Sequence, residues 1–463
     1  MSSTGRFRRS SVSFLLAVPL SSLGLAVADQ RTSTDDPLRG MREPRKMHPA
    51  VTETHTVDAA VNHQQLERSP KPMSNAKIEQ AAALMEGFGQ RTGLTSQQDP
   101  RRYLWTDAFA VCNFLGLART TGNQGYTELA LRLVDQVHHS LAKHRTDSPT
   151  RGWISGLSEP EGEAHPTHGG LRIGKTLPER RADEPFDQQL EWERDGQYFH
   201  YLTKWMHALD QVTRSTGEPR YRRWASELAV AAHGAFSYLP PAHHRPRMYW
   251  KMSVDLSRPL VSSMGQHDPL DGYVTVTQLS ATLSEPVESL DQKGLARVRA
   301  QFFNMLQSSE LATPDPLGIG GLLADAYRVE QLIRLDATAD NALIKRLLDA
   351  ALSGLRAYDS SGELHAPARY RLAFRELGLS IGLEAVKRMH EDVLKKRSPL
   401  GPRERAGLEA LLPYVPVGDE IESFWRQSGH QDTDNWLEHR DINEVMLATR
   451  LAADGFLDLV TTD

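Results

Sequence analysis

The sequence predicts an all-α fold, an (α/α)6 toroid in which six inner helices form a ring inside six outer helices. Long segments with apolar residues at helical spacing alternate along the chain, and we find no alternating strand pattern bounded by hairpin turns. Within the pairs, the first helix is apolar nearly all round and the second carries its charges on one side, as expected for an inner and an outer layer. One helix is left over at each end of the chain, and these two helices can pair and close the ring.

The predicted helices follow one another closely. The first, unpaired helix is expected at 76–93, where apolar residues recur at helical spacing and Gly93 provides a C-terminal cap. Five pairs follow, at 105–119 with 126–144, 195–213 with 221–238, 271–283 with 290–308, 318–335 with 341–358, and 370–390 with 402–425. The sixth inner helix is predicted from 441 to 460. An open solenoid of helical hairpins is the alternative, but its two ends would need capping repeats.

The segment from Glu191 to His207 shows most clearly how a polar loop leads into a buried helix. It begins with carboxylates and Trp192, passes one glycine and continues as a helix. Two neighbouring faces of this helix are apolar or aromatic, and they carry Phe199, Leu202, Met206 and Leu209, and Tyr198, Tyr201 and Trp205. A helix of this kind is buried on most sides, so we expect it in the inner ring.

The first 28 residues have the pattern of a cleaved secretory signal. Three arginines within residues 6–9 precede an uncharged run from 10 to 27, and the run ends in small residues that a signal peptidase accepts. Pro19 interrupts this run, which is short for a membrane span. We therefore expect an exported protein, periplasmic or secreted, without a transmembrane span. Residues 29–73 contain hardly any apolar residues in phase and are expected to be a disordered tether or pro-segment before one domain at 74–463.

Composition excludes several classes of partner. The chain has 54 basic and 59 acidic residues, and removal of the signal segment leaves 51 basic residues against the same 59. Such an acidic chain has no electrostatic footprint for nucleic acid. Its single cysteine, Cys112, lies in an apolar helical run and is expected to be a buried thiol. The sequence contains no motif for zinc, calcium or a nucleotide phosphate, so we expect no metal and no cofactor.

The loops that lead into the inner helices include LWTDAF, EWERDGQYF, HDPLDGY and HRDINE. Together with the pairing pattern, they resemble the (α/α)6 toroids of the six-hairpin glycosidase-like superfamily. The resemblance covers residues 76–460 and is one of architecture. Fold alone does not determine function, so no catalytic residue follows from this resemblance by position.

In a toroid these loops converge on one end of the ring, and there the sequence concentrates aromatic residues, carboxylates and arginines. Such a set of side chains suits a carbohydrate, whose CH face packs on aromatic rings and whose hydroxyl groups form hydrogen bonds. The predicted substrate-binding residues are Trp105, Asp107, Trp192, Glu193, Gln197, Tyr198, His267, Asp268, Tyr273, Arg371, Arg375, Trp436, His439 and Arg440.

Glycosidic cleavage requires one carboxylic acid that protonates the leaving oxygen and a second carboxylate that activates water or attacks the sugar. Asp195, in the aromatic setting of Trp192 and Tyr198, is predicted to be the general acid with a raised pKa. Asp441 or Asp271 is predicted to be the base. The alternative for each of these residues is an ordinary helix N-cap, because Asp is a preferred capping residue.

The leading hypothesis is therefore an exported glycoside hydrolase of the inverting type. A sugar epimerase or isomerase on the same toroid would use two histidines as proton carriers, with His267 and His439 as candidates. The export signal argues against this alternative, because free sugars are usually cytoplasmic substrates. A polysaccharide lyase could use the pair His243-His244 with Tyr249 and Trp250 as its base and acid. A glycan-binding protein of the cell envelope would have the aromatic cleft without a productive carboxylate pair.

The signal segment predicts a specific mature terminus. The secreted protein should begin at or near Asp29, because the small residues that end at Ala28 form the expected cleavage site. N-terminal sequencing of the secreted protein measures this directly. Recovery of a soluble protein with an intact Met1 or Ser2 terminus would contradict it.

Overall fold

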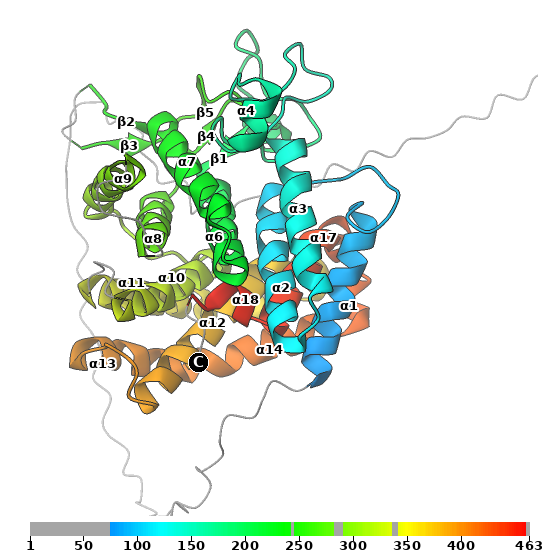
Figure 1. Cartoon of the computed structure of the whole chain (residues 1–463). Coiled ribbons are helices and arrows are strands. Elements are labelled where there is room, and N and C mark those ends of the chain that lie inside the picture. Colours follow the sequence, from blue (N-terminus) through cyan, green and yellow to red (C-terminus); the bar gives the residue numbers. More distant parts are fainter. Residues whose placement is uncertain (1–74, 242–244, 282–289, 336–340, 460–463) are drawn as a thin grey trace, which may run out of the picture. The chain divides into compact units, whose positions relative to one another are not determined.

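A computed structural model describes residues 75–241, 245–281, 290–335 and 341–459 of the chain (Figure 1). The predicted signal segment, the predicted tether, and His243 and His244 lie outside the described residues. Six helices form the inner ring: α2 (Leu104–Thr121), α6 (Phe199–Thr216), α8 (Asp268–Ala281), α10 (Pro316–Arg334), α12 (Ala373–Leu394) and α17 (Arg440–Leu451). Each packs against the next in this order, and α17 packs back against α2. The predicted all-α (α/α)6 toroid is therefore confirmed.

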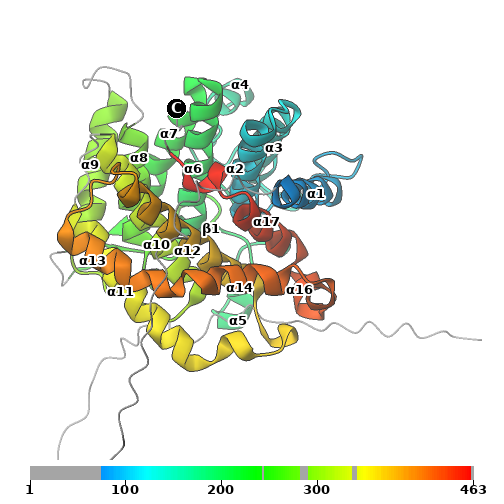
Figure 2. The same cartoon turned by 90° about the horizontal axis from the view of Figure 1, so that it is seen from below.

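The outer helices cover the ring one by one. They are α3 (Gly125–Leu141) on α2, α7 (Pro219–Phe236) on α6, α9 (Leu290–Leu306) on α8 and α11 (Asn341–Ser361) on α10. The fifth outer position is occupied by α13 (Pro402–Leu411) and α14 (Val415–Trp425), joined by the 3-10 turn η4 (Leu412–Tyr414). The N-terminal helix α1 (Asn75–Arg91) packs against α17, and Figure 2 shows the two side by side. The first helix thus closes the ring, as predicted.

Burial explains the division into two layers. In α2 every residue from Leu104 to Ala118 is buried, whereas α3 buries one stripe that includes Leu133 and Val137. An apolar stripe on one face is what a helix at the protein surface requires. Cys112 lies in α2 as a buried free thiol, as predicted. Among the described residues, no helix combines the length and the apolar character needed to cross a bilayer.

The loops around the second inner helix contain structure that the sequence pattern does not predict. Helix α6 begins at Phe199 rather than at Asp195, because Gly196 adopts a φ of 146° and Gln197–Tyr198 form strand β1. Strand β1 pairs with β4 (Lys251–Met252), which pairs with β5 (Pro259–Val261), and β2 (Ser237–Tyr238) pairs with β3 (Arg247–Met248), all antiparallel. Strands of two or three residues are too short to give a readable alternation.

The remaining short elements lie in the loops between the long helices. They are α4 (Glu159–Ala164), α5 (Gln188–Glu193), η2 (Glu363–His365), η3 (Ala368–Tyr370), α15 (Ser428–Gln431) and α16 (Asp434–Glu438).

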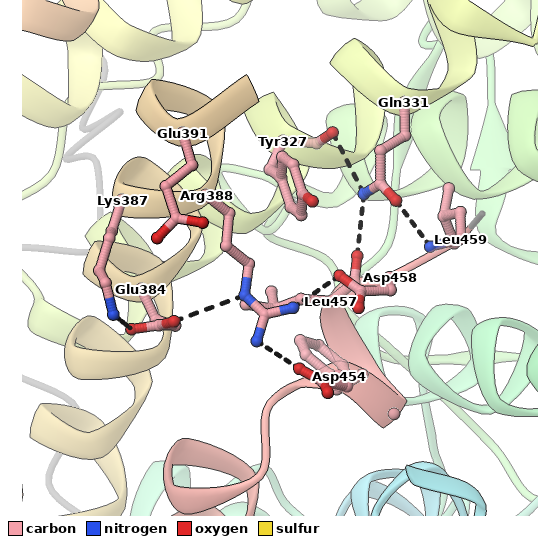
Figure 3. Close-up of polar contacts among 12 residues, drawn as sticks. Tyr327, Gln331, Glu384, Lys387, Arg388, Glu391, Asp454, Leu457, Asp458 and Leu459 are labelled. Atoms are coloured by element: carbon pink, nitrogen blue, oxygen red, sulfur yellow. Dashed lines mark hydrogen bonds and ion pairs between the residues drawn. The ribbon is translucent and has the colours of Figure 1, made fainter. Parts of the chain in front are cut away.

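The predicted final helix is shorter than expected, and the chain then turns back into the ring. Helix α17 ends at Leu451, and the short helix α18 (Asp454–Leu457) packs against α2, α6 and α10. The carbonyl oxygens of residues 455–457 accept hydrogen bonds of 2.8–3.0 Å from His207, Gln211 and Gln331. Figure 3 shows Gln331 among these contacts and Arg388, which binds Asp454 and Asp458. The last described segment therefore fills the ring near the C-terminal ends of its inner helices.

Glycine allows α10 and α12 to approach at backbone distance. A Cβ atom on Gly320 would collide with the backbone of Gly378, whereas one on the next residue, Gly321, would meet nothing within 4 Å. We expect Gly320→Ala to lower the free energy of unfolding by about 1–3 kcal/mol, because overpacking forces the helices apart. Gly321→Ala is the matched control and should gain up to about 1 kcal/mol from the better helix propensity of alanine. Urea unfolding of both variants measures the difference, and equal stabilities would contradict the close packing.

Candidate functional site

Five aromatic side chains, which we call the aromatic cluster, gather where the loops lead into α2 and α6. They are Tyr103, Trp192, Tyr198, Tyr201 and Trp250. The hydroxyl oxygens of Tyr103 and Tyr201 lie 2.8 Å apart, and the ring of Tyr198 packs edge-on against Tyr201 at 5.2 Å. Trp192 of α5 lies 5.0 Å from Trp250 and 6.3 Å from Tyr198, measured between ring centroids. Loops from distant parts of the sequence thus place five aromatic rings together.

Beside this cluster, two pairs of polar residues face each other between α6 and α8. His200 and Lys204 are one turn apart on α6, and Asp268 and Asp271 are one turn apart on α8. The His200 Nδ1 atom lies 3.7 Å from Asp268 Oδ1, and Lys204 Nζ lies 3.1 Å from Asp271 Oδ1. We call these four residues the polar ladder. His200 also packs against Tyr201 at 4.9 Å, which joins the ladder to the aromatic cluster.

The two carboxyl groups of the ladder differ in charge. Asp268 is 3 % exposed, and its Oδ2 atom has no hydrogen-bond partner among the described residues. Burial, and then the negative charge of Asp271, raise the pKa of Asp268 to about 8. Asp268 is therefore protonated at neutral pH and has a proton to donate.

Asp271 is held in the ionised form. Burial opposes its ionisation, but the charge and the hydrogen bond of Lys204 lower the pKa of Asp271 below its usual value. Asp325 of α10 is hydrogen-bonded to Asp271, and burial raises the pKa of Asp325 to about 6 although Arg328 opposes the rise. Asp268 and Asp271, one helical turn apart on α8, thus have opposite protonation states. Acid–base catalysis uses such an arrangement.

The histidine of the ladder is neutral. Burial lowers the pKa of His200 to about 4, although Asp271 opposes this. A neutral imidazole next to a protonated carboxyl group can exchange a proton with it without creating an isolated charge. Within the described residues, no group of three or more His, Cys, Asp or Glu side chains converges to hold a metal ion.

The predicted general acid Asp195 is not part of this ladder. Its side chain is completely buried and forms an ion pair with Arg172. Its Oδ1 atom accepts hydrogen bonds from the backbone amides of Gly174 at 3.0 Å and Lys175 at 3.3 Å. Both oxygens are thus bound by the protein, and the residue lies before β1 rather than at the N-terminus of α6. The contacts of Asp195 hold the loop that carries Arg172, Gly174 and Lys175.

Of the two predicted bases, only Asp271 belongs to the polar ladder. Asp441, in the first turn of α17, pairs with Arg91 of the outer helix α1, whose Nε atom lies 3.0 Å from Asp441 Oδ1. Its contacts therefore join an inner helix to an outer helix.

Eight of the predicted substrate-binding residues are buried, and six of these lie outside the aromatic cluster and the polar ladder. They are Trp105 with Phe109, Asp107 with Arg102, Gln197 with Val254, Tyr273 with Phe303, Arg371 with Glu376, and Trp436 with Trp425. These contacts fix the loops and the first turns of the inner helices. We therefore assign these six residues to the support of the site.

The other predicted binding residues have different surroundings. Trp192 and Tyr198 belong to the aromatic cluster, and Asp268 belongs to the ladder. Glu193 is partly exposed at the end of α5, and Arg440 is exposed and pairs with Glu444.

The predicted residues His267, Arg375 and His439 differ in whether their nitrogen atoms have partners on the protein. The Nε2 atom of His267 lies 2.8 Å from the carbonyl oxygen of Leu311, and Arg375 pairs with Asp315 at 2.7 Å. Both ring nitrogens of His439 are buried without a hydrogen-bond partner among the described residues. Of the two histidines, His267 thus has a ring nitrogen bound by the protein, whereas His439 has both ring nitrogens free of a partner among the described residues.

Several residues of the site were not among the predicted binding or catalytic residues. They are Tyr103, His200, Tyr201, Lys204 and Asp325, and Trp250 was a candidate only for the lyase alternative. A signal for four residues of the ladder does exist in the sequence. His200 and Lys204 are four residues apart on one inner helix, and Asp268 and Asp271 are three residues apart on the next, so each pair shares one helix face. Charged residues in such apolar helices need partners. Asp325 lies in the middle of α10 and has no comparable local signal.

Comparison of the sequence with protein-family models and with curated proteins gives no match. Among solved structures, the chain is similar to the GH76A α-1,6-mannanase from Salegentibacter sp. HEL1_6, with a TM-score of 0.48 and 11 % identity over 82 % of this chain and 100 % of that chain. It is also similar to the cellobiose 2-epimerase from Spirochaeta thermophila DSM 6192, with a TM-score of 0.42 and 12 % identity over 83 % and 99 % of the two chains.

A third similar structure is a sugar epimerase from a ruminal bacterium, with a TM-score of 0.44 and 9 % identity over 82 % of this chain and 98 % of that chain. At such low TM-scores and identities, these likenesses establish no activity for this chain. The (α/α)6 architecture rests on the helix contacts within the chain itself.

Proposed function

We propose that the chain is an exported carbohydrate-active enzyme, a glycoside hydrolase of the inverting type, with Asp268 as general acid and Asp271 as general base. The observation that carries this proposal is the different surroundings of two buried carboxyl groups on one face of α8. Asp271 pairs with Lys204 at 3.1 Å, whereas Asp268 Oδ2 has no hydrogen-bond partner among the described residues, and the pKa shifts of the two groups have opposite directions. One group keeps its proton at neutral pH and the other has lost it, so the two can act at the same moment.

In this mechanism Asp268 gives its proton to the glycosidic oxygen while the bond between that oxygen and the anomeric carbon breaks. Asp271 takes a proton from a water molecule, whose oxygen forms the new bond to the anomeric carbon. The charge of Lys204, 3.1 Å from Asp271, keeps this carboxylate ionised before the reaction. A proton then passes from Asp271 to Asp268, directly or through solvent, and restores the starting state.

The aromatic cluster would bind the sugar. Rings of Trp192, Trp250 and Tyr201 offer faces on which the CH groups of a pyranose can pack, and the paired hydroxyl groups of Tyr103 and Tyr201 can form hydrogen bonds with it. The same cluster would serve a glycan-binding protein without activity. The ladder supports an enzyme, because a buried, protonated carboxyl group without a partner on one oxygen costs stability.

A sugar epimerase is a second candidate, favoured by the unpartnered ring nitrogens of His439. In that reaction one neutral histidine would remove a proton next to a carbonyl group and another group would return it on the opposite face. His200, which is also neutral, would be the second proton carrier.

The substitution Asp268→Asn tests the general acid. It keeps the shape but removes the transferable proton, and we expect a loss of about 10²- to 10⁴-fold in turnover of natural glycosides. Aryl glycosides with an activated leaving group should lose less, because their leaving oxygen needs less protonation. The measurement is kcat/KM on a panel of nitrophenyl glycosides and the matching disaccharides.

Asp187→Asn is the matched control. Asp187 is exposed and caps α5, where its side chain accepts a hydrogen bond from Leu190 N, so this variant should keep the activity. Equal turnover by wild type and Asp268→Asn on both kinds of substrate would contradict the proposed acid. Conversion of a free sugar into its epimer without hydrolysis would favour the second candidate.

A further inference from the structure

Lys175 presents an unpaired positive charge to the aromatic cluster. Its Nζ atom lies 5.9 Å from the centroid of the Tyr103 ring. The side chain is partly buried, and within the described part of the chain its ammonium group forms no hydrogen bond and no ion pair. Nζ is not among the buried unpartnered atoms of the described residues, so the ammonium group can donate its hydrogen bonds to water or to a bound ligand.

The backbone that carries Lys175 is held rigidly. Gly174, with a φ of 94°, and Lys175 both donate their amides to the buried carboxylate of Asp195. Arg172, two residues before Gly174 on the same loop, pairs with Asp195. A Cβ atom on Gly174 would collide with the carbonyl oxygen of Arg102, so this turn requires glycine. Asp195 thus fixes the position from which the Lys175 side chain extends.

A neighbouring lysine shows what a satisfied ammonium group looks like in the same region. Lys251 is completely buried, and its Nζ atom donates to Glu191 O at 2.6 Å, Glu191 Oε1 at 2.9 Å and Arg194 O at 2.9 Å. Burial, and then the charge of Lys251, lower the pKa of Lys175 to about 8, which still leaves it mainly protonated at neutral pH. Of these two lysines, Lys175 alone lacks an acceptor among the described residues.

A continuous row of side chains leads from Lys175 to the proposed acid. The hydroxyl oxygens of Tyr103 and Tyr201 are 2.8 Å apart, Tyr201 packs on His200 at 4.9 Å, and His200 lies 3.7 Å from Asp268. A substituent bound at Lys175 and a glycosidic bond next to Asp268 would therefore lie along the same row of side chains.

We propose that Lys175 binds an anionic substituent of the sugar, so that the substrate is an acidic glycan. This inference rests on the proposed function, because it assumes that the aromatic cluster and the polar ladder take a sugar. A carboxylate, a sulfate or a phosphate would each satisfy the ammonium group. The whole chain is acidic, with a formal net charge of −5, so its overall charge does not attract anions. The proposed preference for an acidic sugar therefore comes from Lys175 itself.

Binding by the full-length protein at low ionic strength tests this inference. The probes are glucuronate, galacturonate and mannuronate against glucose, galactose and mannose, with glucose 6-sulfate and glucose 6-phosphate to distinguish the anionic groups. We expect at least one acidic sugar to bind about tenfold or more tightly than its neutral counterpart. Lys175→Met should abolish this preference and leave the binding of the neutral sugar unchanged.

Two further variants serve as controls. Lys175→Arg keeps the charge and should keep the preference, and Lys395→Met, which removes an exposed lysine paired with Glu391 on α12, should leave it unchanged. Because Lys175 is unpaired, Lys175→Met should fold with a melting temperature equal to or above that of the wild type.

Equal binding of acidic and neutral sugars, or a preference that survives in Lys175→Met, would overturn the inference. Hydrolysis of acidic glycosides that depends on Asp268 but is unchanged in Lys175→Met would also overturn it and would leave the proposed function intact. Tight binding of acidic sugars that depends on Lys175, without any turnover, would support the inference and contradict the proposed hydrolase.

Discussion

The burial of two aspartates opposite one lysine between α6 and α8 is the constraint on which the site depends. Lys204 can neutralise one carboxylate, and it lies 3.1 Å from Asp271. Burial and the resulting charge on Asp271 then keep the proton on Asp268. The difference in protonation that the proposed chemistry needs is therefore a consequence of how two inner helices pack.

The ring of helices maintains this constraint from several directions. Pairing of α1 with α17 closes the ring, backbone contact at Gly320 draws α10 and α12 together, and α18 fills the interior against α2, α6 and α10. The loops add a second layer of support, in which Asp195 holds the backbone of Lys175 beside the aromatic cluster. Residues that lie far from the proposed reaction thus determine where its side chains can lie.

Much of the ring could be predicted from the sequence because a local apolar pattern indicates each long helix. The two unpaired terminal helices indicated that the ring closes. The end of the last helix could not, because apolar residues continue through Phe456 although the chain turns at Ala452. Asp268 and Asp271 were predicted as site residues from their loop. The role of Asp195 was hidden, because its partner Arg172 is 23 residues away in the sequence. Pairings of that kind depend on the folded loops and leave no periodic signal.

The central claim is that Asp268 carries a proton at neutral pH, and infrared difference spectroscopy of its carboxyl group measures this most directly. The spectrum of Asp268→Asn is subtracted from that of the wild type at each pH, which isolates the C=O stretch of the protonated group. We predict that this band persists at pH 7 and disappears as the pH rises through about 8, because burial and Asp271 raise the pKa of Asp268. If the band has already disappeared when the pH rises to about 5, as for an ordinary aspartate, the account is contradicted.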